Sequence, residues 1–129
     1  MSSIFSKIIN GEIPCFKVAE NECFLAFLDI NPLQKGHVLV IPKVEVDYLF
    51  DLEDDVLADL MIFSKNVAKK IKKVFPCEKV GLTVIGLEVP HAHVHLVPMN
   101  KMNDMNFSNQ KLDLSSEELK SIAESIWNA

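Results

Sequence analysis

Apolar residues in the first third of the chain form short, nearly continuous runs, the pattern of buried β-strands. Two of these runs are separated only by Asn21-Glu22, a spacing that suits a tight hairpin turn. The third run stops at Pro42, whose nitrogen cannot donate a hydrogen bond to a neighbouring strand. A helical pattern before the runs ends at Asn10-Gly11. We therefore expect a helix at residues 2–9 and strands at residues 15–20, 23–28 and 37–41.

The middle of the chain has the clearest helical pattern, from about residue 51 to residue 75. Its apolar residues follow an i, i+3, i+4 spacing and leave the charged residues on the opposite face. Acidic residues occupy its first turn and lysines its last turn, which matches the helix dipole at both ends. The residues expected to face the core are Val56, Leu57, Leu60, Met61, Ser64, Val67, Ala68, Ile71 and Val74.

The last part of the chain predicts two more strands, a polar loop and a final helix. The strands are expected at residues 80–85 and 91–97, and the loop at residues 100–111. Ser115 and Glu118 have the spacing of a capping box at the start of a helix. Strands grouped before and after one long helix favour an α+β fold with an antiparallel sheet over a doubly wound parallel sheet. At 129 residues, we expect one domain that covers residues 1–129.

Charge and cysteine content narrow the class of protein. The chain has 13 Lys+Arg and 18 Asp+Glu residues, a net charge of −5, which disfavours binding to nucleic acid. No run approaches the roughly 20 apolar residues that a membrane span needs, so no membrane association is expected. The three cysteines form no Cys-x-x-Cys pair, which predicts reduced thiols and a cytoplasmic location.

The histidines are the candidate chemical groups. All four are expected on strands, and His91, His93 and His95 alternate with apolar residues. Side chains alternate between the two faces of a strand, so these three imidazoles are expected on one face, about 7 Å apart along the strand. Such a row of rings could act together on one ligand group.

Three aligned imidazoles suit two chemistries. One is zinc binding, for which His-x-His on a strand is a known arrangement. However, no carboxylate follows the triplet closely, and His37 is the only other imidazole. The other is nucleophilic catalysis at phosphorus, because a neutral imidazole with a pKa near about 6.5 is a competent nucleophile at neutral pH. The second chemistry needs fewer additional residues, so we prefer it and expect no metal and no cofactor.

Residues 91–97 resemble the His-x-His-x-His motif of the histidine triad (HIT) family of nucleotidyl hydrolases and transferases. Residues 4–14 are similar to the amino-terminal segment of that family, residues 27–32 to its ribose-binding turn, and residues 36–42 to the strand that follows. The resemblance covers nearly the whole chain up to residue 100. It implies a five-stranded antiparallel sheet with one long helix and a C-terminal helix, and a two-fold homodimer.

The resemblance also implies roles for individual residues. His93 matches the nucleophile that attacks the α-phosphate and is transiently nucleotidylated. His95 matches a residue that contacts the same phosphate, and His91 and His37 match supporting histidines. Asp29 matches the carboxylate that accepts hydrogen bonds from the ribose hydroxyls. The residues that match the apolar slot for the base are Ile4, Phe5, Ile8, Phe27 and Ile30.

The chain departs from the family pattern in two places. In the short stretch before the triad, Leu87 stands where an amide side chain is expected, and Glu88 where the Hint branch has a hydroxyl. We hypothesise that Glu88 replaces this hydroxyl as the acid for the leaving group, which requires burial that raises its pKa. Some members carry Cys-x-x-Cys as metal ligands near the N-terminus, whereas the matching residues here are Ser3 and Ser6. Structural zinc is therefore not expected.

The resemblance implies hydrolysis or transfer at the α-phosphate of a nucleotide conjugate. The preferred substrate is a purine nucleoside phosphoramidate of the Hint type, because a net charge of −5 offers no long-range attraction to a highly anionic substrate. One alternative is hydrolysis of dinucleoside polyphosphates, as in the Fhit branch. Another is a nucleotide-binding module with only incidental activity, and a third is a zinc hydrolase.

Overall fold

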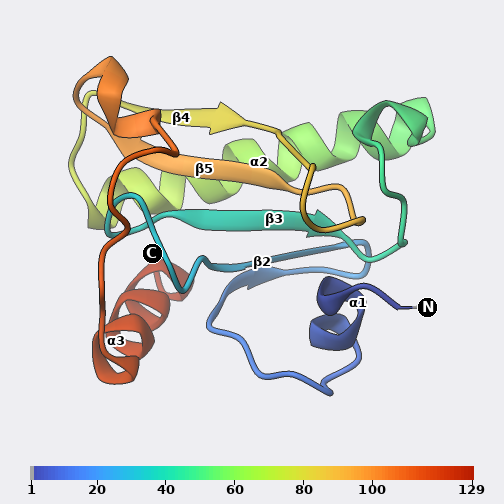
Figure 1. Ribbon diagram of the computed structural model, residues 1–129, viewed down its shortest axis with the longest axis horizontal. Coiled ribbons are helices and arrows are strands. Elements are labelled where there is room, and N and C mark those ends of the chain that lie inside the picture. Colours follow the sequence, from blue (N-terminus) through green and yellow to red (C-terminus); the bar gives the residue numbers. More distant parts are fainter. Residues whose placement is uncertain (1) are drawn as a thin grey trace.

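The computed structural model describes residues 2–129 and contains one five-stranded antiparallel sheet with the strand order β1-β2-β3-β5-β4 (Figure 1). This confirms the expected α+β fold. In the described part of the chain, no helix is both long enough and apolar enough to cross a membrane. The strands are β1 (Lys17–Glu20), β2 (Phe24–Leu28), β3 (Val38–Pro42), β4 (Lys79–Thr83) and β5 (Val94–Met99), and the helices are α1 (Ile4–Ile9), α2 (Asp54–Val74) and α3 (Ser116–Trp127), with 3₁₀ turns at Leu49–Asp51 and Met102–Met105.

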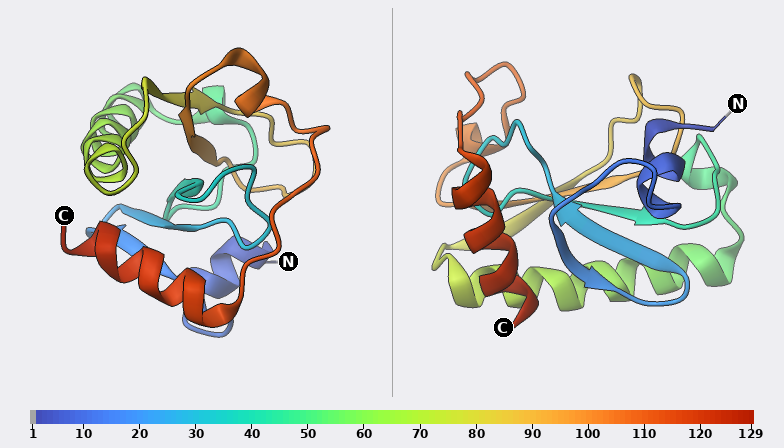
Figure 2. Two further views of the ribbon diagram at one scale, coloured as in Figure 1. Left: turned by 90° about the vertical axis from the view of Figure 1, so that its left-hand side faces the viewer. Right: turned by 90° about the horizontal axis from the view of Figure 1, so that it is seen from below.

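Helices cover both faces of the sheet. Helix α2 packs against one face, whereas α1 lies on the opposite side (Figure 2). Alternate residues of the strands therefore enter two separate cores. The larger core, between the sheet and the helices α2 and α3, includes Val40, Leu60, Val94 and Ile126. The smaller core, on the side of α1, contains Phe5, Leu25, Phe27, Leu39 and Ile41.

The long helix starts later than its sequence pattern predicts. Residues 49–51 form a 3₁₀ turn, and Leu52 and Glu53 are extended, with ψ of 144° and 148°. Helix α2 therefore begins at Asp54 rather than near residue 51. The predicted capping box is confirmed: the Ser115 hydroxyl accepts a hydrogen bond from the Glu118 backbone N–H at 3.1 Å.

The first hairpin has a three-residue link instead of the expected two-residue turn. The link consists of Asn21, Glu22 and Cys23. The Asn21 side-chain oxygen accepts hydrogen bonds from the backbone N–H groups of Cys23 and Phe24 at 2.9 and 2.8 Å. The Asn21 carboxamide thus closes the link and delays the start of β2 by one residue.

Part of the expected core face of α2 is exposed. Leu60, Ser64, Val67 and Ile71 are buried as expected, but Met61 is exposed. It belongs to an apolar surface beside β4, which lies at the edge of the sheet. We call this surface the α2–β4 patch; its exposed members are Phe50, Met61, Ile62 and Leu82, with exposed fractions between 41% and 68%.

Candidate active site

The four histidines come together at the α1 side of the sheet, although only one of them lies in a strand. His95 belongs to β5, His37 immediately precedes β3, and His91 and His93 lie in an irregular segment before β5. The prediction that all four lie on strands was therefore wrong for three of them. The pairing of β5 with β3 begins only at Val94, and β4 has already ended at Thr83, so no neighbouring strand pairs with residues 91–93.

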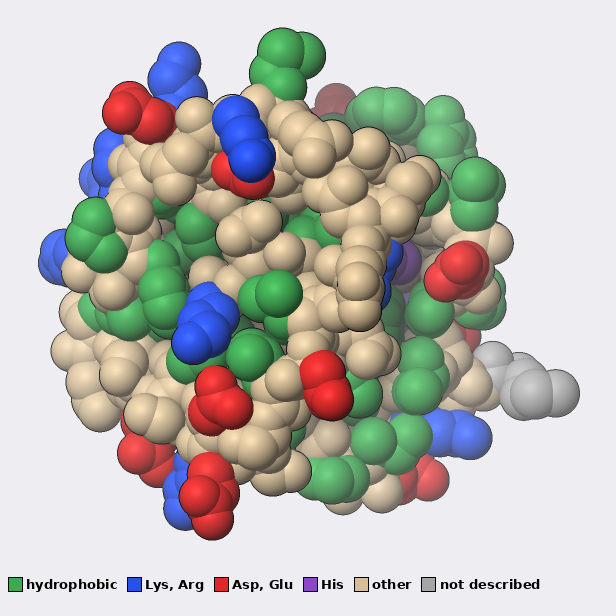
Figure 3. Space-filling model, turned by 60° about the vertical axis from the view of Figure 1, so that its left-hand side comes forward, with side chains coloured by type: hydrophobic (Ala, Val, Ile, Leu, Met, Phe, Trp, Pro, Cys, Tyr) green, Lys and Arg blue, Asp and Glu red, His purple; other side chains and the backbone are tan. Residues whose placement is uncertain are grey.

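The imidazole rings are closer together than an extended strand would place them. The ring centroids of His93 and His95 are 5.0 Å apart, and those of His37 and His95 are 5.2 Å apart. All four rings are buried, with His93 and His95 retaining 7% and 8% of their accessible surface. In the space-filling view, histidine atoms are visible only in a narrow gap between other side chains (Figure 3). The cluster is thus a mostly buried site that reaches solvent through a small opening.

The turn before β3 brings His37 into the cluster. Gly36 has a φ of +93°, a conformation that favours glycine, and a Cβ there would lie 2.7 Å from the Phe75 ring. The backbone N–H of Leu33 donates to Nδ1 of His37 at 3.0 Å. Because Nδ1 accepts this bond, the proton of the neutral ring is on Nε2. The turn therefore fixes the tautomer of His37 as well as its position.

The tautomer of His37 determines that of His95. Nε2 of His37 lies 3.0 Å from Nδ1 of His95 and donates its proton to it. His95 must then carry its own proton on Nε2. This leaves an N–H donor on His95 that is available to a ligand oxygen.

His93 has the opposite tautomer. Its Nδ1 lies 2.8 Å from the carbonyl oxygen of His91, which can only accept, so the proton of His93 is on Nδ1. Nε2 of His93 therefore has a free lone pair. In His91, Nε2 donates to the carbonyl oxygen of Pro42 at 2.8 Å, and Nδ1 accepts from the hydroxyl of Ser3 at 2.9 Å. The cluster thus presents a lone pair on His93 beside an N–H donor on His95.

Burial keeps the imidazoles of His37, His91 and His95 neutral. Desolvation lowers the pKa of His37 to about 3 and that of His95 to about 4, with neighbouring positive charge acting in the same direction. Desolvation also lowers the pKa of His91, against the opposing effects of the Pro42 carbonyl and Glu45. At neutral pH these three rings are uncharged, as the tautomer assignments require.

Asp29 lies at the edge of the cluster. One carboxylate oxygen accepts from the backbone N–H of Asn31 at 2.9 Å, and the other is 3.6 Å from Nε2 of His37. Burial raises the pKa of the carboxyl group, which the bond from Asn31 partly offsets. Asp29, His37 and His95 offer ligand atoms within 4.8 Å of one another. However, Nε2 of His37 and Nδ1 of His95 share a proton across 3.0 Å, so a cation bound by both of these nitrogens would have to displace it.

The residues expected to form an apolar slot have different environments. Phe5 and Phe27 are buried and pack edge-on, with ring centroids 5.6 Å apart. Phe5 also contacts His93 edge-on, with a centroid distance of 5.0 Å. Ile8 is half-buried against the same core, whereas Ile4 and Ile30 are exposed, Ile30 by 61%. The structure therefore brings Phe5 to the cluster and leaves Ile4 and Ile30 on the surface.

The loop before the triad does not bury Glu88. Glu88 is exposed, and Leu87 beside it is 89% exposed. The burial that the leaving-group acid hypothesis requires is therefore not found. Contact between Glu88 and a substrate stays a prediction.

Sequence reasoning missed one side of the site, formed by the polar segment after β5. The ring of Phe107 lies edge-on against His95 and His37, with centroid distances of 4.9 and 6.1 Å. Nζ of Lys111 donates to the carbonyl oxygens of Phe107 and Asn109, the latter at 3.0 Å, which ties this segment together. A single phenylalanine in a polar run gives no periodic signal, so only the folded chain places it.

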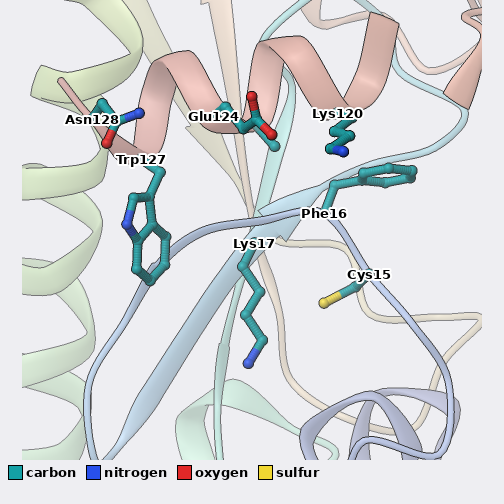
Figure 4. A pocket seen from close by; sticks show the side chains of 8 residues that line it. Cys15, Phe16, Lys17, Lys120, Glu124, Trp127 and Asn128 are labelled. Atoms are coloured by element: carbon teal, nitrogen blue, oxygen red, sulfur yellow. The ribbon is translucent and has the colours of Figure 1, made fainter. Parts of the chain in front are cut away.

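Away from the histidine cluster, a surface hollow lies between α3 and the start of β1 (Figure 4). It has a volume of about 370 Å³. Cys15, Phe16 and Lys17 line one side, and Lys120, Ala123, Glu124, Trp127 and Asn128 line the other. Burial raises the pKa of the Cys15 thiol. No member of the histidine cluster lines this hollow, so the two are separate features.

Comparisons with known proteins show the family of this chain. The family model of the HIT domain matches residues 10–102. An adenosine 5′-monophosphoramidase of Schizosaccharomyces pombe is 38% identical over 98% of this chain and 96% of its own length. Among solved structures, a HIT-like protein from Bartonella henselae superimposes with a TM-score of 0.85 at 29% identity, covering 98% of this chain and 95% of that one. A zinc-bound histidine triad protein from Mycobacterium smegmatis superimposes with a TM-score of 0.82 at 25% identity, covering 99% and 95%. The chain therefore belongs to the histidine triad family.

Proposed function

We propose that this protein hydrolyses purine nucleoside phosphoramidates by forming a covalent nucleotidyl intermediate on His93. Membership of the HIT family and the similarity to an adenosine 5′-monophosphoramidase support nucleotide hydrolase activity. The observation that carries the proposed mechanism is the pair of opposite tautomers. The lone pair of His93 Nε2 stands beside the N–H of His95, whose ring centroid is 5.0 Å away.

In the first step, Nε2 of His93 attacks the α-phosphorus and forms a P–N bond. The bond from phosphorus to the leaving amine breaks, and that amine takes up a proton from solvent water as it departs. The N–H of His95 donates to a phosphoryl oxygen, where it stabilises the charge of the transition state. The carbonyl of His91 accepts from Nδ1 of His93 throughout, so the positive charge that develops on this ring meets a fixed dipole.

In the second step, water attacks the phosphorus of the intermediate. A P–O bond forms and the water gives up a proton to solvent; the P–N bond to His93 breaks, its electron pair returns to Nε2, and a nucleoside monophosphate is released. Imidazole is a good leaving group from phosphorus, so one difficult displacement becomes two easier ones. The tautomer of His93 at the end of the cycle is the one that began it.

The ribose and the base are assigned to the opening of the cluster. Asp29 has a carboxylate that can accept from two ribose hydroxyls, and its side chain retains 21% of its accessible surface. The base lies against apolar residues near α1 and the turn after β2; those proposed are Ile4, Phe5, Ile8, Phe27 and Ile30. Hydrolysis of dinucleoside polyphosphates remains the alternative reaction, and a binding module without turnover the alternative class.

We also propose a two-fold homodimer formed through the α2–β4 patch. Strand β4 is at an edge of the sheet and presents unpaired backbone groups along that side. Leu82 on β4 and Met61 on α2 line one apolar hollow of about 590 Å³. Burying this patch against a second copy would remove both the unpaired edge of β4 and the apolar hollow from water. A cytoplasmic location is proposed as well, on the three unpaired cysteines of the described chain.

The experiment that tests the reaction is trapping of the intermediate. The protein is mixed briefly with adenosine 5′-phosphoramidate, quenched, digested and examined by mass spectrometry of the peptide with the three histidines. We expect an adenylyl group on His93 and release of adenosine monophosphate, both abolished in His93→Ala. Binding of the nucleotide without either product would favour the binding module. Stoichiometric zinc and loss of activity with a chelator would favour a zinc hydrolase.

A further inference from the structure

Glu45 lies outside the histidine cluster but holds the first turn of α1 through two short hydrogen bonds. Its Oε1 atom accepts from the backbone N–H of Ser3 and from the hydroxyl of Ser6, both at 2.6 Å. Glu45 follows β3, so the two bonds join segments that are 42 and 39 residues apart in sequence. Hydrogen bonds to a carboxylate are stronger than those between neutral groups. Accepting them lowers the pKa of Glu45 to about 2, although the side chain is exposed.

Ser3 connects Glu45 to His91 through its own hydrogen bonds. The Ser3 side chain is buried, and its oxygen accepts from the backbone N–H of Ser6 at 3.0 Å as the cap of α1. Its hydroxyl hydrogen is then directed to Nδ1 of His91 at 2.9 Å, because Nε2 of that ring already donates to Pro42. The His91 ring is therefore held at both nitrogen atoms.

His91 and α1 together restrain His93. The carbonyl oxygen of His91 accepts from Nδ1 of His93 at 2.8 Å and so fixes the lone pair on Nε2. Phe5, on α1, packs edge-on against both rings, with centroid distances of 5.9 Å to His91 and 5.0 Å to His93. A continuous chain of contacts thus leads from Glu45 through Ser3 to His93.

We propose that Glu45 is a positioning residue for the reaction: it holds Ser3 and α1 in place and thereby keeps His93 oriented, with Nε2 free for the substrate. The inference rests on the proposed function, in which His93 is the nucleophile. Glu45 takes no part in making or breaking bonds. Its contribution depends on accepting two hydrogen bonds, whereas its charge acts only weakly across the distance to the substrate because the side chain is exposed to solvent.

Two substitutions separate the effect of the hydrogen bonds that Glu45 accepts from the effect of its charge. Glu45→Ala removes the acceptor, and we expect kcat to fall about tenfold with a smaller rise in KM, since His93 is misaligned and the α1 residues proposed to contact the base shift less than the nucleophile. Glu45→Gln removes the charge but retains a side-chain oxygen that can accept from Ser3 and Ser6, and we expect it to restore most of kcat. The matched control is Glu12→Ala, an exposed glutamate just after α1 for which the described chain shows no side-chain partner. We expect the control to keep the wild-type kcat.

A second measurement does not depend on activity. Histidine ring ¹⁵N–¹H spectra report which nitrogen of each ring carries the proton. We expect His91 protonated at Nε2 and His93 at Nδ1 in the wild type and in Glu45→Gln, and mixed or exchanging tautomers in Glu45→Ala.

The outcomes separate this inference from the proposed function. Wild-type kcat and tautomers in Glu45→Ala would overturn the positioning role, as would a Glu45→Gln variant as impaired as Glu45→Ala. A rise in KM with unchanged kcat would overturn it too, because Glu45 would then act on the base-binding residues of α1 and not on the orientation of His93. If the wild type proves inactive but Glu45→Ala still shows mixed tautomers of His91 and His93, the proposed reaction is wrong while the positioning of His93 by Glu45 stands.

Discussion

The phenyl ring of Phe107 stands edge-on against the imidazole of His95, with ring centroids 4.9 Å apart and planes at 72°. The contact joins a residue after β5 to the ring whose Nε2 proton is proposed to bind a phosphoryl oxygen. It contributes apolar surface next to an imidazole whose pKa burial lowers to about 4. The segment after β5 therefore helps to set the protonation state of the site.

Phe107→Ala should expose His95 to water and raise its pKa from about 4 towards the ordinary value near 6.5, because desolvation is the main cause of the depression. An NMR titration of the histidine ring signals measures this directly. His91 serves as the internal control, since its contacts are with Ser3, Pro42 and Phe5, and its pKa should not move. An unchanged pKa of His95 would mean that Phe107 contributes little to its burial.

Stability should fall as the pH is lowered from about 6.5 towards 5. The pKa values of His37 and His95 are lower in the folded protein, about 3 and 4, than in the unfolded chain, near 6.5. In this window unfolding therefore takes up protons, and the free energy of unfolding decreases by up to about 1.4 kcal/mol per pH unit for each histidine. Chemical denaturation at several pH values measures the slope. His37→Gln removes one of the two groups and should reduce it; an equal slope in that variant would contradict the assignment.

Asp29→Ala should raise KM about tenfold with little change in kcat, because the carboxylate is assigned to the ribose hydroxyls and not to the phosphate. The sharper measurement compares adenosine 5′-phosphoramidate with its 2′-deoxy analogue. The wild type should discriminate between them, and Asp29→Ala should not. Asp59→Ala, at an exposed position of α2, is the control and should discriminate as the wild type does. If Asp29→Ala still discriminates between the two substrates, another group recognises the 2′-hydroxyl of the ribose.

Glu88→Gln should leave kcat within about threefold of the wild type, because Glu88 is exposed and lacks the burial that an acid in this role needs. Steady-state kinetics with a phosphoramidate whose leaving amine is strongly basic gives the most sensitive assay, because such an amine departs poorly without a proton. A hundredfold loss of kcat would instead restore Glu88 as the group that protonates the leaving amine.

Leu82→Glu should convert the proposed dimer to a monomer, because it places a charge in the middle of the α2–β4 patch. Size-exclusion chromatography with light scattering gives the mass. Met102→Glu adds the same charge at a side chain that is 92% exposed and outside the patch, and it should remain dimeric. A dimeric Leu82→Glu variant would place the interface elsewhere.

The sequence by itself determined the element types and their order, because these follow from local patterns. The i, i+3, i+4 spacing of α2, the Ser115–Glu118 capping box and the apolar strand runs each act over a few residues. The spacing of His91, His93 and His95 also indicated a shared site, since neighbouring residues cannot separate far. These patterns did not determine the element ends: α2 starts at Asp54, after a 3₁₀ turn and two extended residues, and β5 starts at Val94, where its pairing with β3 begins.

Only the tertiary structure decided how the imidazoles are protonated and what surrounds them. The proton of His37 is placed by Leu33, and that of His93 by the carbonyl of His91. The chain segments that meet at the site also come from distant parts of the sequence, as Phe107 against His95 and Glu45 against Ser3 illustrate. The physical reason is that a tautomer depends on hydrogen-bond partners in three dimensions, and such partners follow no spacing along the chain.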